Sequence, residues 1–116
     1  MVYLAKEQGR REKENAQNGK GVIKFRDLLT KEDMGGRAWM LSTITVNPGC
    51  SIGEHAHTEN GEAYCILQGE ATLIEDGKEY TLHAGDVEFC ADGHTHGIEN
   101  RTDEDVVFLA VIVPNL

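Results

Sequence analysis

Four side chains of the types that bind transition metals occur in two separate stretches of this chain, and their spacing constrains the fold. His55 and His57 are two residues apart, so on an extended strand both point to the same side. The polar, glycine-ended segment 58–61 can turn the chain back and bring Glu62 to the same place. His96 comes much later and can join them only if the sheet closes on itself. The spacing therefore predicts a closed β-structure around a shared point.

The rest of the folded part has the composition of short strands separated by turns. Lys24 and Arg26 alternate with apolar neighbours, a period of two that gives one wet and one buried face. The Asp76-Gly77 pair suits a two-residue hairpin loop because both positions accept positive φ. Regular spacing of such segments is typical of a sandwich or barrel. The predicted strands cover residues 22–29, 38–46, 51–57, 62–68, 70–75, 78–82, 86–90, 95–100 and 106–113.

The beginning of the chain lacks this pattern. Residues 1–21 are mostly charged and polar without an apolar stripe, so we expect an N-terminal arm, flexible or packed on a partner subunit. Residues 22–116 are expected to form one barrel domain, a size that holds a single core. The only helical signal lies at 28–34, where Thr30 can cap a short turn with Asp33.

The two histidine-containing stretches resemble the paired signature motifs of the cupin superfamily. Ala91 is the one departure, standing where the family usually has proline, and it affects only the stiffness of the turn before His96. The resemblance implies an all-β, double-stranded β-helix or jelly-roll barrel with a metal ion inside. The matching positions are Gly49, His55, His57, Glu62 and Gly69 in the first motif, and Gly85, Gly93, His96 and Asn100 in the second.

The expected metal ligands are His55, His57, Glu62 and His96. Three imidazoles and one carboxylate suit one divalent transition metal ion per chain, Mn, Fe, Ni, Co or Zn, better than Ca or Mg. Four protein ligands around an ion that accepts six leave two positions for water or a substrate. The alternative is a degenerate cupin whose histidines only form hydrogen bonds inside the barrel. The remaining candidates are expected outside the ligand set: His94 as a neighbour of the site, His83 and Glu59 on the surface.

Alternation from Glu62 places Tyr64 on the inward face with the metal, next to Ile66. Tyr64 is therefore a candidate for substrate binding, although a packed core tyrosine fits the same pattern. We expect Trp39, Met40 and Phe89 to lie in the core rather than in the pocket.

Cys65 and Leu67 point outward by the same alternation and would be exposed in a monomer. Because cupins commonly dimerise through such a sheet face, the resemblance implies a homodimer.

The net charge and the cysteine content indicate which binding partners and which cellular compartment to expect. The net charge of −9 disfavours binding to nucleic acids and to anionic membranes. Three widely spaced cysteines indicate neither a disulfide framework nor a zinc ribbon. The first residues lack the apolar segment of a secretory signal, so we expect a cytoplasmic protein.

Two functions fit these observations. In the first, the metal acts on a small oxygenated organic metabolite in the barrel, with oxygenase, decarboxylase or isomerase chemistry, all of which occur in the superfamily. In the second, the chain is a non-catalytic sensor or carrier that binds a metal and a small molecule. A phosphosugar isomerase is disfavoured because Lys24, Arg26 and Arg37 show no clustering typical of a phosphate clamp. Spacing identifies no catalytic acid or base outside the metal ligands.

Overall fold

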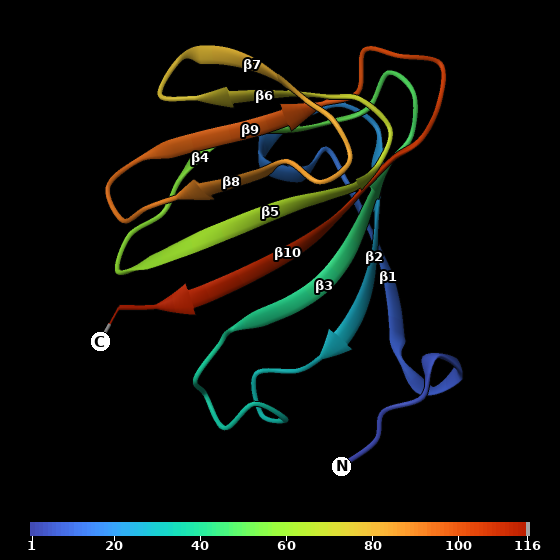
Figure 1. The fold of residues 1–116 in the computed structure, drawn as a ribbon, viewed down its shortest axis with the longest axis vertical. Coiled ribbons are helices and arrows are strands. Elements are labelled where there is room, and N and C mark those ends of the chain that lie inside the picture. Colours follow the sequence, from blue (N-terminus) through green and yellow to red (C-terminus); the bar gives the residue numbers. More distant parts are fainter. Residues whose placement is uncertain (116) are drawn as a thin grey trace.

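The computed structural model describes residues 1–115 and shows two antiparallel sheets facing each other (Figure 1). The larger sheet has the strand order β1-β2-β3-β10-β5-β8, and the smaller has the order β4-β9-β6-β7. This is the predicted all-β jelly-roll architecture. The strands are β1 (Gly9–Glu14), β2 (Val22–Leu29), β3 (Met40–Val46), β4 (Ser51–Ala56), β5 (Asn60–Gln68), β6 (Ala71–Glu75), β7 (Lys78–Leu82), β8 (Val87–Cys90), β9 (Thr95–Glu99) and β10 (Val106–Pro114).

The core lies between the inner faces of the two sheets. Strand β10 shows the alternation that positions it, because Val106, Phe108 and Ala110 are buried while the residues between them are only half-buried. Ile66 and Tyr64 of β5 are buried on the same inner face, as the alternation from Glu62 predicts. Burial of these side chains supplies the main stabilisation of the barrel.

Two corners of the barrel depend on particular residues of the signature motifs. Gly69 has φ +86°, and a Cβ atom there would lie 2.4 Å from the carbonyl oxygen of Asp105, so no larger residue fits. Asn100 is buried and donates from Nδ2 to the carbonyl oxygens of Val46 (2.8 Å) and Glu104 (2.6 Å). These residues hold the strand ends together.

The predicted hairpin at Asp76-Gly77 is confirmed. Both residues have positive φ, 49° and 80°, and they join β6 to β7 with Glu75 opposite Lys78.

The cap predicted between Thr30 and Asp33 is present, but no helix follows it. The amide of Thr30 donates to the Asp33 carboxylate (2.9 Å), and the amide of Asp33 donates to Thr30 Oγ1 (3.0 Å), but the chain forms only turns there.

The N-terminal segment differs from the sequence expectation. Strand β1 pairs with β2 from Gly9 opposite Asp27 to Glu14 opposite Val22, so the sheet begins within the segment expected to be an arm. Two short 3-10 helices flank β1, η1 (Ala5–Glu7) and η2 (Ala16–Asn18). All six residues of β1 are exposed, which explains why no apolar pattern indicated this strand. Backbone hydrogen bonds to β2 define it instead. Within the described residues, no helix has the length and apolar character needed to span a bilayer.

Candidate metal centre

The four predicted ligands come together between the two sheets. His55 on β4 is opposite His96 on β9, and His57 lies one residue beyond the end of β4. Glu62 reaches the same point from β5 in the larger sheet. The ligand atoms of the four side chains all lie within 4.8 Å of one another. The β-structure therefore closes and brings His96 to the other three residues, as their spacing in the sequence required.

The distances between the donor atoms fit a single metal ion. The Nε2 atoms of His57 and His96 are each 3.1 Å from Glu62 Oε1 and 3.1 Å from each other. His55 Nε2 is 3.9 Å from the same carboxylate oxygen. Metal bonds of about 2.1 Å that meet at right angles place neighbouring donor atoms about 3 Å apart. The cluster thus has the size of a coordination shell.

A hydrogen-bond acceptor fixes the second ring nitrogen of each histidine. The Nδ1 atoms of His55, His57 and His96 lie 2.8 Å from Gly53 O, 2.6 Å from Asn60 Oδ1 and 2.9 Å from a Glu88 oxygen, respectively. Since these oxygens accept hydrogen bonds, each Nδ1 carries the proton and each Nε2 presents its lone pair to the centre.

The orientation of the Asn60 amide is itself fixed. Its Nδ2 donates to the carbonyl oxygen of Thr58 (2.9 Å), which leaves Oδ1 to accept from His57. Two imidazole lone pairs 3.1 Å apart, at His57 and His96, repel unless a cation or a proton lies between them. This geometry is what a bound metal ion requires.

Burial and neighbouring charged groups have opposite effects on the pKa values of Glu62 and His96. Burial alone would raise the pKa of Glu62, but the three imidazoles that face its carboxylate outweigh this effect when they are protonated, and hold that pKa well below its usual range. Burial opposes the charged form of His96, yet its hydrogen bonds to Glu62 and Glu88 raise its pKa to about 9. Without a metal ion, a proton on His96 therefore offsets one of the two carboxylate charges, and a metal ion has to displace this proton.

Glu88 and Asn60 contribute to the centre, and the sequence interpretation did not single them out. Glu88 lies on β8, buried like Cys90 two residues later, while Val87 and Phe89 are exposed. The sequence alone carries no signal for this role, because alternation of apolar residues would place Val87 and Phe89, not Glu88, on the buried face. Asn60 begins β5, where the loop after His57 was expected to do no more than turn the chain.

Tyr64 packs directly against His96, one of the four clustered donor residues. Its ring is stacked on the imidazole of His96 at 4.5 Å and touches Phe108, and only 1% of the residue is exposed. Burial, reinforced by the Glu62 and Glu88 carboxylates, raises the pKa of its hydroxyl well above the usual value. Tyr64 therefore supports the site as a packed residue, and it also lines the cavity beside the donors.

The other candidate residues lie outside the cluster. His94 is exposed and 2.6 Å from the Asp76 carboxylate, His83 is exposed and 3.0 Å from Glu70, and Glu59 is exposed. Phe89, expected in the core, is on the outer surface with 52% exposure, because its neighbours on β8 occupy the inner face. Met40, also expected in the core, packs against it and borders the cavity that opens from the donors. Trp39, expected in the core as well, is 38% exposed and borders the same cavity.

That cavity has a volume of about 330 Å³ and opens between β1, the η2 segment and the ends of β3, β4 and β10. Its walls are mostly apolar, with polar groups at the donors and on β1. Besides the donors, they include Arg11, Lys13, Gln17, Phe25, Ile44, Ile52, Asn60 and Ile112. A cavity of this size suits a small metabolite.

Comparison with known families and proteins agrees with this architecture. Residues 42–112 match the model of the cupin domain. The chain is 40% identical over 99 residues to an oxalate-binding protein of Thermotoga maritima, which covers 85% of this chain and 82% of that protein. It is 32% identical over 76 residues to the tetracenomycin polyketide synthase protein TcmJ of Streptomyces glaucescens, covering 66% of this chain and 51% of that protein.

Solved structures show the same relationship. The crystal structure of a predicted oxalate decarboxylase from Thermotoga maritima superposes with a TM-score of 0.93 at 38% identity, covering 98% of this chain and 99% of that one. KdgF from Halomonas sp. superposes with a TM-score of 0.79 at 15% identity, over 100% of this chain and 94% of that one, a likeness of fold alone.

Proposed function

Since this chain belongs to the cupin superfamily, we propose that it binds a small carboxylate such as oxalate on a divalent transition metal ion inside the barrel. The observation that carries the proposal is the convergence of three imidazole lone pairs and one ionised carboxylate on a point inside a small cavity. His55, His57, Glu62 and His96 would hold the ion. When bound, such an ion supplies a Lewis acid with open positions for ligand oxygens.

The chain's own groups prepare that ligand site. Gly53, Asn60 and Glu88 keep the histidines in the tautomer that can bind a metal. Apolar residues such as Ile44, Ile52 and Ile112 limit water in the cavity and strengthen electrostatic attraction there. We include Tyr64 among the residues proposed to contact the ligand, because its ring borders both the cavity and His96.

The ligand class is supported by the names of matches from Thermotoga maritima and by the cavity. One relative is named as an oxalate-binding protein, and one solved structure as a predicted oxalate decarboxylase. The cavity of about 330 Å³ is small, and the basic residues Arg11 and Lys13 line its wall. Small anions with oxygen donors fit this combination of metal, size and positive charge.

Turnover of the ligand is the second candidate function. The metal with open positions supports oxygenase, decarboxylase or isomerase chemistry on the bound metabolite. Against it, Glu62 is the only acidic residue on the cavity wall within residues 1–115, and it already faces the histidines. Binding without turnover, as in a sensor or carrier, needs no catalytic acid or base beyond the groups on the cavity wall. We therefore place it first.

One experiment separates these functions. Protein purified without added metal is analysed for metal content and then titrated with oxalate by calorimetry, before and after removal of the metal. We expect close to one metal ion per chain and oxalate binding only in the metal-loaded protein. The same sample is assayed for oxygen uptake and for carbon dioxide release. Sustained release or uptake would establish an enzyme, and absence of oxalate binding by the loaded protein would overturn the proposed ligand.

We further propose that two copies associate through the outer face of the larger sheet. Leu67, Val87 and Phe89 are exposed there by 51%, 63% and 52%, a set of apolar side chains that a monomer leaves in water. They lie on the neighbouring strands β5 and β8. A second copy covering this face would remove them from solvent.

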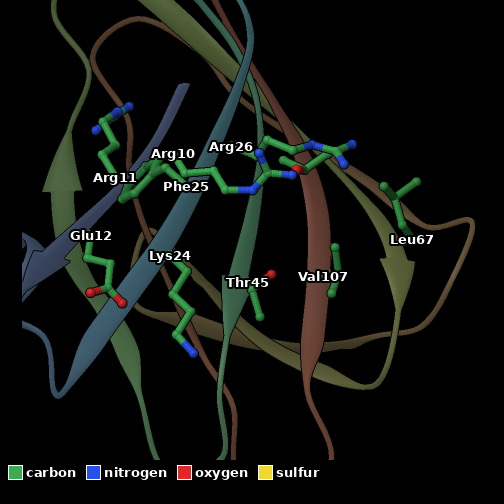
Figure 2. Close-up of a pocket in the computed structure, with 10 residues that line it drawn as sticks. Arg10, Arg11, Glu12, Lys24, Phe25, Arg26, Thr45, Leu67 and Val107 are labelled. Atoms are coloured by element: carbon green, nitrogen blue, oxygen red, sulfur yellow. The ribbon is translucent and has the colours of Figure 1, made fainter. Parts of the chain in front are cut away.

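A basic groove of about 720 Å³ lies on the same face (Figure 2). Arg10 and Arg26 are directly opposite each other in the β1–β2 pairing, and Figure 2 shows both side chains extending across β3. Like charges in such positions repel unless an anion lies nearby. Arg26 Nε is buried, with no hydrogen-bond partner within residues 1–115.

The charge of the chain indicates what could meet this groove. Arg10, Lys24 and Arg26 form no ion pair within the described part of the chain, although the whole chain has a net charge of −9. We therefore propose that acidic side chains of a second copy meet this groove.

The three cysteines are free, which supports the proposal of a reducing, cytoplasmic location.

A further inference from the structure

Both basic residues on the wall of the metal cavity come from β1. In the pairing with β2, Arg11 is opposite Phe25 and Lys13 is opposite Ile23. Ile23 is fully buried, and Phe25 packs against the core. Since paired residues share a face of the sheet, Arg11 and Lys13 lie on its inner side, toward the cavity that contains the metal donors. Strand β1 thus supplies the positive wall of the site.

Arg11 and Lys13 differ in their side-chain contacts. Arg11 donates from Nε and Nη2 to the Asp27 carboxylate, at 2.9 and 3.2 Å, and its guanidinium lies 4.0 Å from the centre of the Phe25 ring. Asp27 therefore neutralises Arg11 and fixes its position. Lys13 has no ion-pair partner anywhere in residues 1–115. Its charge is the one on the cavity wall that remains available to a ligand.

The placement of the positive charges indicates the kind of ligand. A divalent ion would lie among the four donors and the unpaired Lys13 ammonium lies on the cavity wall, while the Glu62 and Glu88 carboxylates are already directed at the histidines. A ligand that reaches from the ion to Lys13 needs negative charge at both ends, and a small dicarboxylate provides it.

On the basis of the proposed function, we propose that Lys13 binds the outer carboxylate oxygens of a small dicarboxylate that is held on the metal, and so selects dianions over monoanions. Lys13 is then a specificity residue, distinct from the four metal ligands. Strand β1, whose sequence shows no apolar pattern, would then contribute a residue to the ligand site.

A structural role for Lys13 makes a different prediction. Inward-pointing charges on an edge strand prevent unwanted pairing with other sheets, and β1 is the edge of the larger sheet. In that case Lys13→Gln would increase aggregation and leave ligand affinity unchanged. Ligand selectivity is therefore the measurement that separates the two roles.

The test uses two ligands that chelate a metal through similar five-membered rings but differ in charge, oxalate and glycolate. Both are titrated by calorimetry into the manganese-loaded full chain, for wild type, Lys13→Gln and Lys13→Arg. We expect Lys13→Gln to weaken oxalate binding about tenfold while glycolate affinity changes less than about twofold. Lys13→Arg should restore most of the oxalate affinity, and manganese content should be the same in all three proteins.

Lys6→Gln is the matched control, because it makes the same change in the N-terminal segment at an exposed residue away from the cavity. It should bind oxalate like wild type. If wild type binds oxalate and Lys13→Gln binds it equally well, the role of Lys13 is overturned and the proposed function stands. If metal-loaded wild type binds neither ligand, both the proposed function and this inference fail.

Discussion

Glu88 holds His96 by both carboxylate oxygens, which lie 2.9 and 3.2 Å from Nδ1, and the imidazole is completely buried. The carboxylate comes from β8 of the larger sheet and the histidine from β9 of the smaller one. This contact therefore joins the two sheets at the candidate metal centre. It also fixes the histidine tautomer and makes Nε2 a better electron donor to a metal.

Glu88→Gln should weaken metal binding by about tenfold or more, because the amide keeps the shape of the carboxylate but removes its charge. Affinity is measured by competition with a coloured chelator at pH 7.5. Glu70→Gln is the matched control, since Glu70 makes a similar contact with the exposed His83 at 3.0 Å. Equal affinities for Glu88→Gln and wild type would show that Glu88 does not tune the metal site.

His57→Ala should lose stoichiometric metal while the barrel stays folded. The residue lies just after β4 and contributes one of the four donors, so its removal opens the site without removing a core side chain. Metal content by mass spectrometry and far-UV circular dichroism check the two parts. His94→Ala, in an exposed residue outside the donor cluster, should keep the metal. A full complement of metal in His57→Ala would contradict the ligand assignment.

Tyr64→Phe should keep the metal and the fold but weaken oxalate binding severalfold, because the hydroxyl is proposed to contact the ligand. The substitution preserves the ring that is stacked on His96 and packed on Phe108. Calorimetry on the metal-loaded variant measures the effect. Unchanged oxalate affinity would assign Tyr64 to packing alone, which was the alternative that its sequence position left open.

The convergence of His55, His57, Glu62 and His96 could be predicted from sequence because the residue types and their spacing are both specific. Two histidines at a spacing of two, a carboxylate after a turn and a distant third histidine are compatible with few folds other than a closed barrel. The inward position of Tyr64 followed from the same alternation, and the structure buries it as predicted. The hairpin at Asp76-Gly77 was predictable because its backbone conformation restricts the residue types.

The parts that could not be predicted depend on long-range contacts. Strand β1 is exposed along its whole length and is specified by backbone pairing with β2, which leaves no apolar period in the sequence. Glu88 resembles any polar strand residue until the fold places it next to His96. Phe89 was expected in the core because of its size, but alternation on β8 places it outside.

The metal-stripped protein should lose stability as the pH rises from 6.5 to 9. Hydrogen bonds to Glu62 and Glu88 outweigh the cost of burial and raise the pKa of His96 from 6.5 to about 9. The folded state therefore holds this proton more tightly than the unfolded state. Its contribution is complete below pH 6.5 and is lost as the pH passes through 9. Glu62, whose pKa is lowered, acts in the opposite sense and loses its contribution only when the pH falls below 4.5.

Calorimetry of stripped and metal-loaded protein between pH 5 and 9.5 tests this expectation. The Tm of the stripped protein should fall by about 5 °C or more between pH 6.5 and 9. The loaded protein should not follow, because the metal ion replaces the proton among the donors. A stripped protein whose Tm is constant or rises over this range would show that His96 is not protonated in the folded state.

Val87→Glu should convert the expected homodimer into monomers. Val87 is 63% exposed on the outer face of the larger sheet, belongs to the exposed apolar set with Leu67 and Phe89, and does not line the basic groove. A carboxylate there would be buried among apolar residues in the dimer, at a cost of several kcal/mol. Light scattering coupled to size-exclusion chromatography measures the mass. Tyr80→Glu is the matched control, because Tyr80 is a partly exposed aromatic residue on β7 of the smaller sheet. A wild-type mass of one chain, or a dimer disrupted by Tyr80→Glu and not by Val87→Glu, would show that the outer face of the larger sheet is not the interface.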